Sequence, residues 1–316
     1  MSGFLEILEF SFSVTGPIFV ILGLGVLLRR VGLLTDAFID AGARLVFTIA
    51  LPALLFLSIS RTRIGDAANV GMITFGLIAT VLFYLLAERV ARVAVAGKRD
   101  RGVVVQGAFR SNFGIIGLAY CVNAYGEAGL AAASLYLGLL TILVNVLAVI
   151  TLSRSLQRST GLGRILRGVA GNPLIVGILL ALPVSAWNIP LPTVALQATQ
   201  YLADMTLPLA LLCTGASLDF RRMRDEIGNT ALAAAGKLVA MPLLFVGGSL
   251  ALGFRGMDLG IMLLMASAPS AAAGYVMVRA MGGNATLAAN IIALTTLGSL
   301  LTTSLGVMAL TALDLM

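Results

Sequence analysis

The chain has 316 residues, of which 59% are hydrophobic and 11% are charged. An ordinary soluble domain carries roughly 25% charged residues, so the composition excludes a soluble protein of this length. A net charge of +7 would suggest nucleic-acid binding in a soluble chain, but membrane proteins collect Lys and Arg in their cytoplasmic loops. The composition therefore predicts a polytopic membrane protein that has no nucleic-acid partner and contacts the lipid bilayer.

Residues with special chemistry are few. The N-terminal stretch carries Glu6 and Glu9 where a signal peptide would carry Lys or Arg, so we expect no cleaved signal. Cys121 and Cys213 lie inside apolar runs, which is typical of packed thiols. Histidine, the commonest metal ligand, is absent from the sequence. We expect neither a metal nor a cofactor.

Apolar runs of about 20 residues, long enough to cross a bilayer core, follow one another along the chain. Because they lack sustained alternation of polar and apolar residues, they predict helices and an all-α protein. Ten transmembrane helices are predicted near 13–28, 44–60, 69–87, 102–123, 128–152, 172–188, 199–218, 230–252, 256–280 and 285–313. The loops on one side hold 16 Lys and Arg and those on the other side hold 3, so the positive-inside rule predicts that both termini lie outside.

The two halves of the sequence share landmarks at one offset. Pro17 and Pro173 are 156 residues apart, and so are Pro52 and Pro208. Proline next to Gly or Asn marks a turn or a helix boundary. We therefore predict helix breaks or hinges at Pro17, Pro52, Asn172, Pro173 and Pro208.

The offset divides the chain into three parts. We predict a first five-helix repeat over residues 1–152, a cytoplasmic linker over 153–171 and a second five-helix repeat over 172–316. Because five is odd, the second repeat enters the membrane inverted relative to the first. Inverted repeats of this kind are typical of secondary transporters, which hold the substrate near the midplane between the repeats.

Small and polar residues gather in the middle of the fourth and ninth predicted spans. The fourth contains RSNFGIIG (110–117), and the ninth contains ASAPSAAAG (266–274), in which Pro269 removes a backbone donor. Broken helices expose backbone groups to a cavity, and their N-terminal ends favour anions. We predict that both spans unwind and cross near the membrane centre. The alternative is that these small residues only allow close helix packing.

Three ionisable side chains fall within predicted spans. Arg110 lies about eight residues inside its span, roughly 12 Å at helical rise. It either meets an anionic substrate or a coupling carboxylate, or it snorkels to the headgroups. Lys237 is similarly placed, and a lysine in a dry site can lose its proton, which would suit proton coupling. Asp204 lies four residues before Pro208 and either carries a coupling proton or sits in the outer interface.

Motifs of soluble catalytic machinery are missing from the sequence. Loops of at most about twenty residues leave no room for a nucleotide-binding domain, and no GxxxxGK[ST] motif occurs. GxSxG and HExxH are absent as well. We therefore expect neither an enzyme nor direct use of ATP.

Seven motifs together give the chain a resemblance to a known family. They are RRVGLL (29–34), LPALLF (51–56), RSNFGIIG (110–117), NPLIVGILL (172–180), LPLALLCTGASL (207–218), KLVAMP (237–242) and ASAPSAAAGYV (266–276). With them the chain resembles the auxin efflux carrier family over essentially its whole length. The resemblance implies ten helices in two inverted repeats, a fold of the sodium/proton antiporter and bile acid symporter type, with broken helices four and nine crossing at the substrate site.

The same resemblance implies how such a carrier works. Spans 1, 2, 6 and 7 would form a scaffold, through which a homodimer forms, and spans 3–5 and 8–10 a transport domain that moves as an elevator. The implied substrates are small organic anions, either malonate or malate as in bacterial members or indole acetate as in plant members. Because the linker 153–171 is short, we expect a prokaryotic carrier in the inner membrane, with a proton as the possible coupling ion.

The substrate site implied by the resemblance draws on both mid-span clusters. Its residues are Arg110, Ser111, Asn112, Gly114, Gly117, Pro269, Ser270, Ala271 and Gly274, with Lys237 and Asp204 as electrostatic or coupling candidates. One position departs from the family pattern, which has a proline soon after the glycine of helix four, where this chain has Ala119. We therefore expect the break of that helix to rest on Gly114 and Gly117.

Two other functions fit the same predicted architecture. A bile-acid-type sodium symporter would need intramembrane carboxylates, of which Asp204 is the one plausible example. A membrane sensor would bind its ligand without moving it, but the repeat suits alternating access better. Uptake that depends on sodium would favour the symporter, and binding without transport would favour the sensor.

Overall fold

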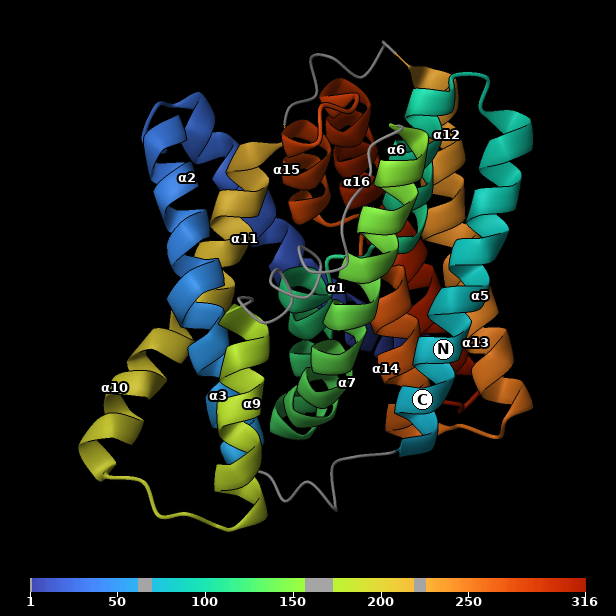
Figure 1. The fold of residues 1–316 in the computed structure, drawn as a ribbon. Coiled ribbons are helices and arrows are strands. Elements are labelled where there is room, and N and C mark those ends of the chain that lie inside the picture. Colours follow the sequence, from blue (N-terminus) through green and yellow to red (C-terminus); the bar gives the residue numbers. More distant parts are fainter. Residues whose placement is uncertain (1, 62–69, 157–172, 219–225) are drawn as a thin grey trace.

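The computed structural model describes residues 2–61, 70–156, 173–218 and 226–316, and every regular element in them is helical (Figure 1). The first half contains α1 (Ser2–Arg30), α2 (Asp36–Leu45), the π-helix η1 (Val46–Ala50), α3 (Leu51–Ser60), α5 (Val70–Ala94), α6 (Lys98–Phe109), the π-helix η2 (Phe113–Gly117) and α7 (Leu118–Ser155). The second half contains α9 (Pro173–Ala186), α10 (Thr193–Asp204), α11 (Thr206–Ser217), α12 (Ile227–Ala235), the π-helix η3 (Gly236–Ala240), α13 (Met241–Ala251), α14 (Gly256–Ser267), α15 (Ala272–Ala280) and α16 (Ala285–Ala312).

Six of the described helical stretches are long and apolar enough to cross a membrane. They are Leu5–Arg30, Asp36–Ser60, Val70–Ala94, Phe113–Ser155, Ile227–Ala251 and Ala285–Ala312. Two shorter apolar helices, Pro173–Ala186 and Gly256–Ser267, add to them. The chain is therefore an all-helical polytopic membrane protein, and its arrangement as ten helices in two inverted repeats stays a prediction.

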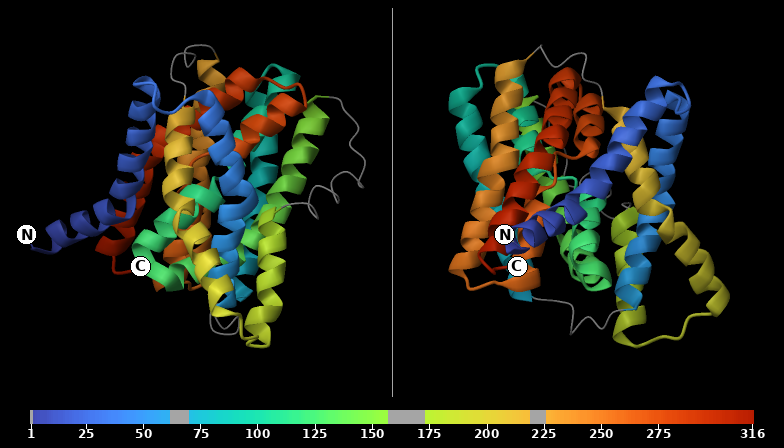
Figure 2. Two further views of the ribbon diagram at one scale, coloured as in Figure 1. Left: turned by 90° about the vertical axis from the view of Figure 1, so that its left-hand side faces the viewer. Right: turned by 180° about the vertical axis from the view of Figure 1, so that it is seen from behind.

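The helix boundaries differ from the predicted spans at several places. α1 begins at Ser2 and not near residue 13, and its first turns project from the bundle (Figure 2). α7 runs from Leu118 to Ser155 and joins parts of two predicted spans across a kink at Gly126, whose φ is 60°. Glycine adopts this left-handed conformation without a steric penalty, so a turn between two predicted helices becomes a kink within one.

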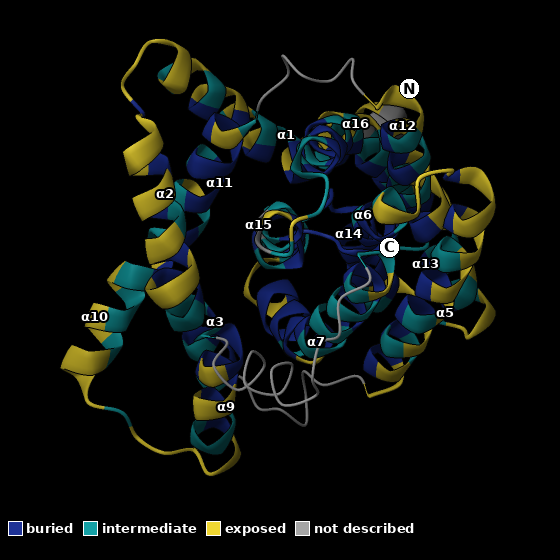
Figure 3. Ribbon diagram, turned by 45° about the horizontal axis from the view of Figure 1, so that its top comes forward, coloured by how far each residue is buried: buried dark blue, intermediate teal, exposed yellow. Residues whose placement is uncertain are grey.

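The helices form two groups around α1 (Figure 3). On one side α2, α3, α9, α10 and α11 pack together, and on the other side α5 to α7 pack with α12 to α16. α1 contacts α11 of the first group and both α7 and α16 of the second. The predicted scaffold would combine α1 with the first group, and the predicted transport domain would be the second group. This division stays a prediction.

The packing of α1 against α11 depends on two glycines. A Cβ atom added at Gly25 would lie 2.3 Å from the carbonyl oxygen of Leu212, and one added at Gly215 would lie 2.1 Å from that of Leu22. Such distances are shorter than any real contact, so only glycine fits. Small residues that let backbones approach closely are a common way to join helices in membranes.

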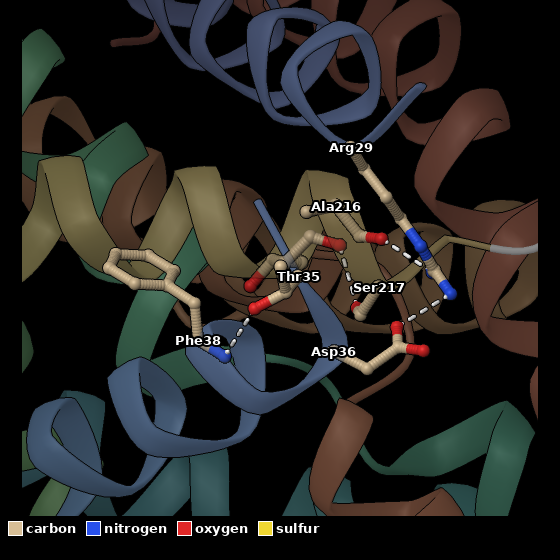
Figure 4. Close-up of polar contacts among 7 residues, drawn as sticks. Arg29, Thr35, Asp36, Phe38, Ala216 and Ser217 are labelled. Carbon is tan, nitrogen blue, oxygen red and sulfur yellow. Dashed lines mark hydrogen bonds and ion pairs between the residues drawn. The ribbon is translucent and has the colours of Figure 1, made fainter. Parts of the chain in front are cut away.

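A polar corner joins α1, α2 and α11 at one end of this pair (Figure 4). Arg29 donates from Nη1 to the carbonyl of Ala216 (2.7 Å) and from Nη2 to Asp36 Oδ1 (3.0 Å). Thr35 caps α2 by accepting a hydrogen bond from the backbone N–H of Phe38 (3.2 Å). The corner thus brings together the RRVGLL and GASL motifs, which are far apart in the sequence.

The predicted hinge prolines mostly begin helices. Pro173 is the first residue of α9, Pro208 lies in the first turn of α11, and Pro52 lies at the start of α3 directly after η1. In the first turns of α9 and α11 a proline costs no helical hydrogen bond, because its missing N–H would have no partner within the helix. Pro52 lies inside the continuous helical stretch Asp36–Ser60, where the π-helix η1 directly precedes it. Asn172 lies outside the described residues.

Pro17 behaves differently from Pro173 and Pro208. It lies in the interior of α1, which continues from Ser2 to Arg30, so no break occurs there. Membrane helices tolerate a proline when neighbouring side chains supply the lost donors. Pro17 removes the donor to the carbonyl of Ser13, and Asn123 of α7 donates from Nδ2 to the next carbonyl along the helix, that of Val14 (3.0 Å).

Candidate functional site

Two helices stop in the middle of the bundle, each at one of the clusters singled out in the sequence. α6 ends at Phe109, and the backbone of residues 110–112 is non-helical before η2 begins, with φ −88° and ψ 92° at Arg110 and φ −77° and ψ 62° at Asn112. α14 ends at Ser267, and residues 268–271 are extended before α15 begins, with ψ 138° at Ala268 and 132° at Ala271. We call residues 110–112 the first break and residues 268–271 the second break.

The two breaks lie against each other as a short antiparallel pair, which we call the crossing. The N–H of Asn112 donates to the carbonyl of Pro269 (2.7 Å), and the N–H of Ala271 donates to the carbonyl of Arg110 (2.9 Å). Ser111 and Ser270 face each other between these bonds. Unwound backbone inside a membrane protein needs such partners, because lipid offers none. The breaks therefore satisfy each other, and Pro269 accepts where it cannot donate.

Ser270 ties the crossing to two further helices. Its Oγ donates to the carbonyl of Gly107 on α6 (2.6 Å), and its backbone N–H donates to Oγ1 of Thr295 on α16 (3.1 Å). The side chain and the backbone of one residue thus fix the second break from opposite sides. The crossing is held as one unit with α6 and α16.

The position of the first break corrects one expectation. Gly114 and Gly117 lie inside η2, and Gly117 has the helical φ of −60° and ψ of −48°. They do not break the helix, because the hydrogen bonds to the second break interrupt it earlier, at residues 110–112. A Cβ at Gly117 would lie 2.7 Å from Sδ of Met265. This glycine therefore permits close packing against α14, and a role for either glycine in substrate binding stays a prediction.

The guanidinium of Arg110 is buried beside the crossing. Its Nη2 donates to Oδ1 of Asn145 on α7 (2.7 Å), and its Nη1 lies 3.6 Å from Sδ of Met277 on α15. Asn145 is itself oriented by a bond from its Nδ2 to the carbonyl of Thr141 (2.8 Å). With 8% of its surface exposed, Arg110 points into the bundle and does not snorkel outward.

Lys237 is fully buried at the other side of the crossing, in η3. Its Nζ donates to Oγ of Ser111 in the first break, and to the carbonyl of Ala266 just before the second break (2.7 Å). The sulfur of Met241 lies 3.0 Å from the same nitrogen. Residues that are far apart in the sequence thus place two cationic side chains against one pair of breaks.

Neither of these cations has a carboxylate partner among the described residues. The ion pairs there join Arg29 to Asp36 and Arg92 to Glu88. Asp204, predicted either to carry a coupling proton or to sit in the outer interface, is exposed at the end of α10 and accepts a hydrogen bond from Nε2 of Gln200 (2.6 Å). Because α10 packs on α3 at the edge of the bundle (Figure 1), the structure does not bring Asp204 to the crossing.

A small cavity opens beside the crossing, between α6, α15 and α16. Its polar lining comes from Gln106, Arg110, Ser270 and Tyr275, and Ala271 also faces it. Its volume of about 20 Å³ suits roughly one water molecule. The Oε1 atom of Gln106 is buried without a hydrogen-bond partner in the part of the chain that the structure describes, so the cavity presents an unsatisfied acceptor next to a cation.

Gln106 is a site residue that sequence reasoning missed. It lies in the last turn of α6, four residues before Arg110, inside the apolar run VVVQGAF. A polar residue at that spacing was the available signal. Asn145 is an amide inside a predicted span, a position that predicts an interhelical hydrogen bond, and it forms one with Arg110.

The sequence is similar to known membrane transporters. The family model described as membrane transport protein matches residues 12–307. The chain belongs to this family of membrane transporters, that of the auxin efflux carriers. Within the family, the chain is 27% identical over 288 residues to an uncharacterized transporter of Methanothermobacter thermautotrophicus, with 90% of this chain and 93% of that protein covered.

A second relative gives the same picture. The chain is 26% identical over 269 residues to an uncharacterized transporter of Methanocaldococcus jannaschii, with 81% of this chain and 85% of that protein covered. Both relatives are similar over nearly their whole length and are named as transporters. The family and these relatives identify the chain as a membrane transporter and leave its substrate open.

Proposed function

We propose that this transporter is a secondary carrier that binds a small organic anion at the crossing of the two breaks. The observation that carries the proposal is the pair of buried cations, Arg110 and Lys237, which meet no carboxylate among the described residues. Buried charges without a counter-charge are costly in a membrane protein. An anionic substrate would supply that counter-charge.

The helix ends at the crossing support the same sign of charge. η2 and α15 both begin there, at Phe113 and Ala272. The first N–H groups of a helix have no partner within it, and the helix dipole makes this end a binding place for anions. A carboxylate would bind these N–H groups and the Asn112 amide, with Arg110 beside it. A malonate- or malate-type dicarboxylate, or an auxin-like monocarboxylate, has the required group.

The size of the cavity supports alternating access. A volume of about 20 Å³ does not hold an organic acid, so the cavity would have to widen before an acid could bind. We propose an elevator movement, with the scaffold formed by spans 1, 2, 6 and 7 and the transport domain by spans 3–5 and 8–10. The shared architecture of inverted-repeat carriers supports this division.

The distribution of basic residues supports a topology with both termini outside, and the relatives support a location in the inner membrane. Because basic residues are concentrated in one set of loops, we place both termini outside. The similarity to prokaryotic transporters and the short linker support an inner-membrane carrier. Homodimer formation through the scaffold belongs to the same proposal.

Uptake into proteoliposomes tests the proposal. We expect radiolabelled malonate, malate or indole acetate to enter vesicles that contain the wild type. Arg110→Ala and Asn112→Ala should each reduce this uptake while expression is kept, and Arg279→Ala, at an exposed arginine of α15, serves as the matched control. Wild-type uptake in both site variants would remove the crossing as the binding site.

The same vesicles test the coupling ion. Accumulation that requires an imposed pH gradient indicates proton coupling, and equilibration that ignores the gradient indicates a uniporter. Accumulation that requires a sodium gradient indicates a sodium symporter.

A further inference from the structure

The ammonium group of Lys237 makes contacts that a cation placed only to attract an anion would not need. It joins a hydroxyl of the first break, Ser111 Oγ, to a backbone carbonyl next to the second break, that of Ala266. These two atoms come from the two helices that cross. The third close atom is the sulfur of Met241, one turn further along Lys237's own helix. Lys237 therefore links both broken helices to the helix formed by α12, η3 and α13.

The contacts have the form expected of a cation. An ammonium has three donors and no acceptor, and here three acceptor atoms surround it. The Ala266 carbonyl belongs to the last turn of α14, which ends at Ser267. Helix C-terminal ends carry partial negative charge and favour cations. Ser111 and Ala266 thus offer a hydroxyl and a carbonyl oxygen at the end of a half-helix.

In ion-coupled carriers, unwound carbonyls and the C-terminal ends of half-helices coordinate the coupling cation. The nitrogen of Lys237 lies at atoms of this kind. Because the side chain fills the space and is 0% exposed, a dissociable ion has no room beside those oxygens. The position of the lysine and the chemistry of its acceptors lead to one inference.

We propose that Lys237 is a built-in cation, which holds the two breaks together in place of a dissociable sodium ion. The part of this inference that concerns transport rests on the proposed function, whereas the part that concerns the joined breaks stands on the contacts alone. A cation attached to the chain cannot be released with the substrate. The wild type should therefore need no sodium, either for the stability of the crossing or for uptake.

Once the attached cation is removed, the stability of the protein should depend on a free cation. Lys237→Ala deletes the atoms of a propylammonium ion and leaves Ser111 Oγ and the Ala266 carbonyl without their donor. Lys237→Met removes the charge but fills most of the same space. Lys98→Ala, at an exposed position, is the matched control, because Lys98 is the other lysine of the chain.

The experiment measures the melting temperature of the purified full-length protein in detergent at constant ionic strength. N-methylglucamine chloride is the background, and sodium chloride or propylammonium chloride replaces it. In the background, both Lys237 variants should melt lower than the wild type by roughly 5 °C. Sodium or propylammonium should recover at least half of this loss for Lys237→Ala. Neither salt should help Lys237→Met, where the space is filled.

Three results would overturn the inference. The first is a Lys237→Ala variant that melts like the wild type and Lys98→Ala in the background. The second is a destabilised Lys237→Ala variant that neither cation stabilises, because Lys237 would then act by packing alone. The third is a wild type that sodium stabilises over N-methylglucamine. This last comparison needs no variant, so it decides the question even where Lys237→Ala does not fold.

Melting temperatures separate this inference from the proposed function. A cation effect on Lys237→Ala supports the built-in cation even if no acid is taken up by the vesicles. If an acid is taken up, the wild type should carry it at the same rate in sodium and in N-methylglucamine. A wild-type rate that falls more than about tenfold without sodium would contradict the inference and leave anion binding at the crossing intact.

Discussion

Changing Asn145 to Asp should weaken anion binding without weakening the fold. Oδ1 of Asn145 accepts a hydrogen bond of 2.7 Å from Nη2 of Arg110. Asn145→Asp places a carboxylate at nearly the same position and neutralises the guanidinium, while the hydrogen bond becomes charge-assisted and stronger. The expected result is a protein of unchanged or higher melting temperature that holds its substrate poorly.

The magnitude follows from the geometry of the guanidinium. A substrate carboxylate on the far side of Arg110 would lie roughly 6 Å from the new carboxylate, which is about two hydrogen-bond lengths. Two unit charges at this distance repel by about 3 kcal/mol at an effective dielectric constant of 20. Since each 1.4 kcal/mol is tenfold in affinity, the KM for uptake should rise by about 100-fold.

The assay is the concentration dependence of uptake for whichever acid the wild type carries, together with the melting temperature of each purified variant. Asn145→Leu is the matched control, because it removes the acceptor without adding charge. It should lower the stability by about 2 kcal/mol and raise KM much less than Asn145→Asp does. If Asn145→Asp leaves KM unchanged, Arg110 does not face the transported anion and the electrostatic argument fails.

Two further substitutions test the packing and the crossing. Gly25→Ala should lower the melting temperature by roughly 5 °C or more, because its Cβ would lie 2.3 Å from a backbone oxygen of α11, whereas Gly23→Ala, with nothing within 4 Å, should change it little. Equal melting temperatures of the two glycine variants would refute the close packing of α1 on α11. Ser270→Ala removes the bond to the carbonyl of Gly107 and should slow uptake severalfold while costing only about 1 kcal/mol of stability. An unaltered uptake rate in Ser270→Ala would show that this tie is not needed for transport.

Composition was enough to predict a membrane protein, because the 11% of charged residues cannot cover a soluble surface. The helical class followed from the length of the apolar runs and their lack of alternation. The clusters at RSNFGIIG and ASAPSAAAG also identified both places where helices stop, since small and polar residues weaken a helix that lipid would otherwise favour. Local sequence could not give the exact position of the first break. Its location at residues 110–112 depends on hydrogen bonds to Pro269 and Ala271, far away in the chain.

For the same reason, the sequence could not predict the hydrogen-bond partners of the two buried cations. Arg110 and Asn145 are 35 residues apart, and Lys237 and Ser111 are 126 residues apart. Nothing in the spacing of either pair indicates contact, because only the crossing brings these helices together. Asp204 shows a case in which the sequence left two alternatives open, since its position in an apolar run suited either a coupling acid or the outer interface. The side chain is exposed where α10 ends, which fits the interface and not a deep acid.

The measurement that tests anion binding at the crossing most directly is protection of a cysteine placed there. Ala271→Cys puts a thiol in the second break and beside the cavity, and the two native cysteines are buried, so background labelling should be low. The rate of modification by an anionic methanethiosulfonate reagent would be measured with and without the transported acid, with Lys98→Cys as an exposed control. We predict that the acid slows labelling at position 271 at least fivefold and leaves position 98 unchanged. Equal labelling rates at position 271 with and without an acid that the vesicles take up would contradict binding at the crossing.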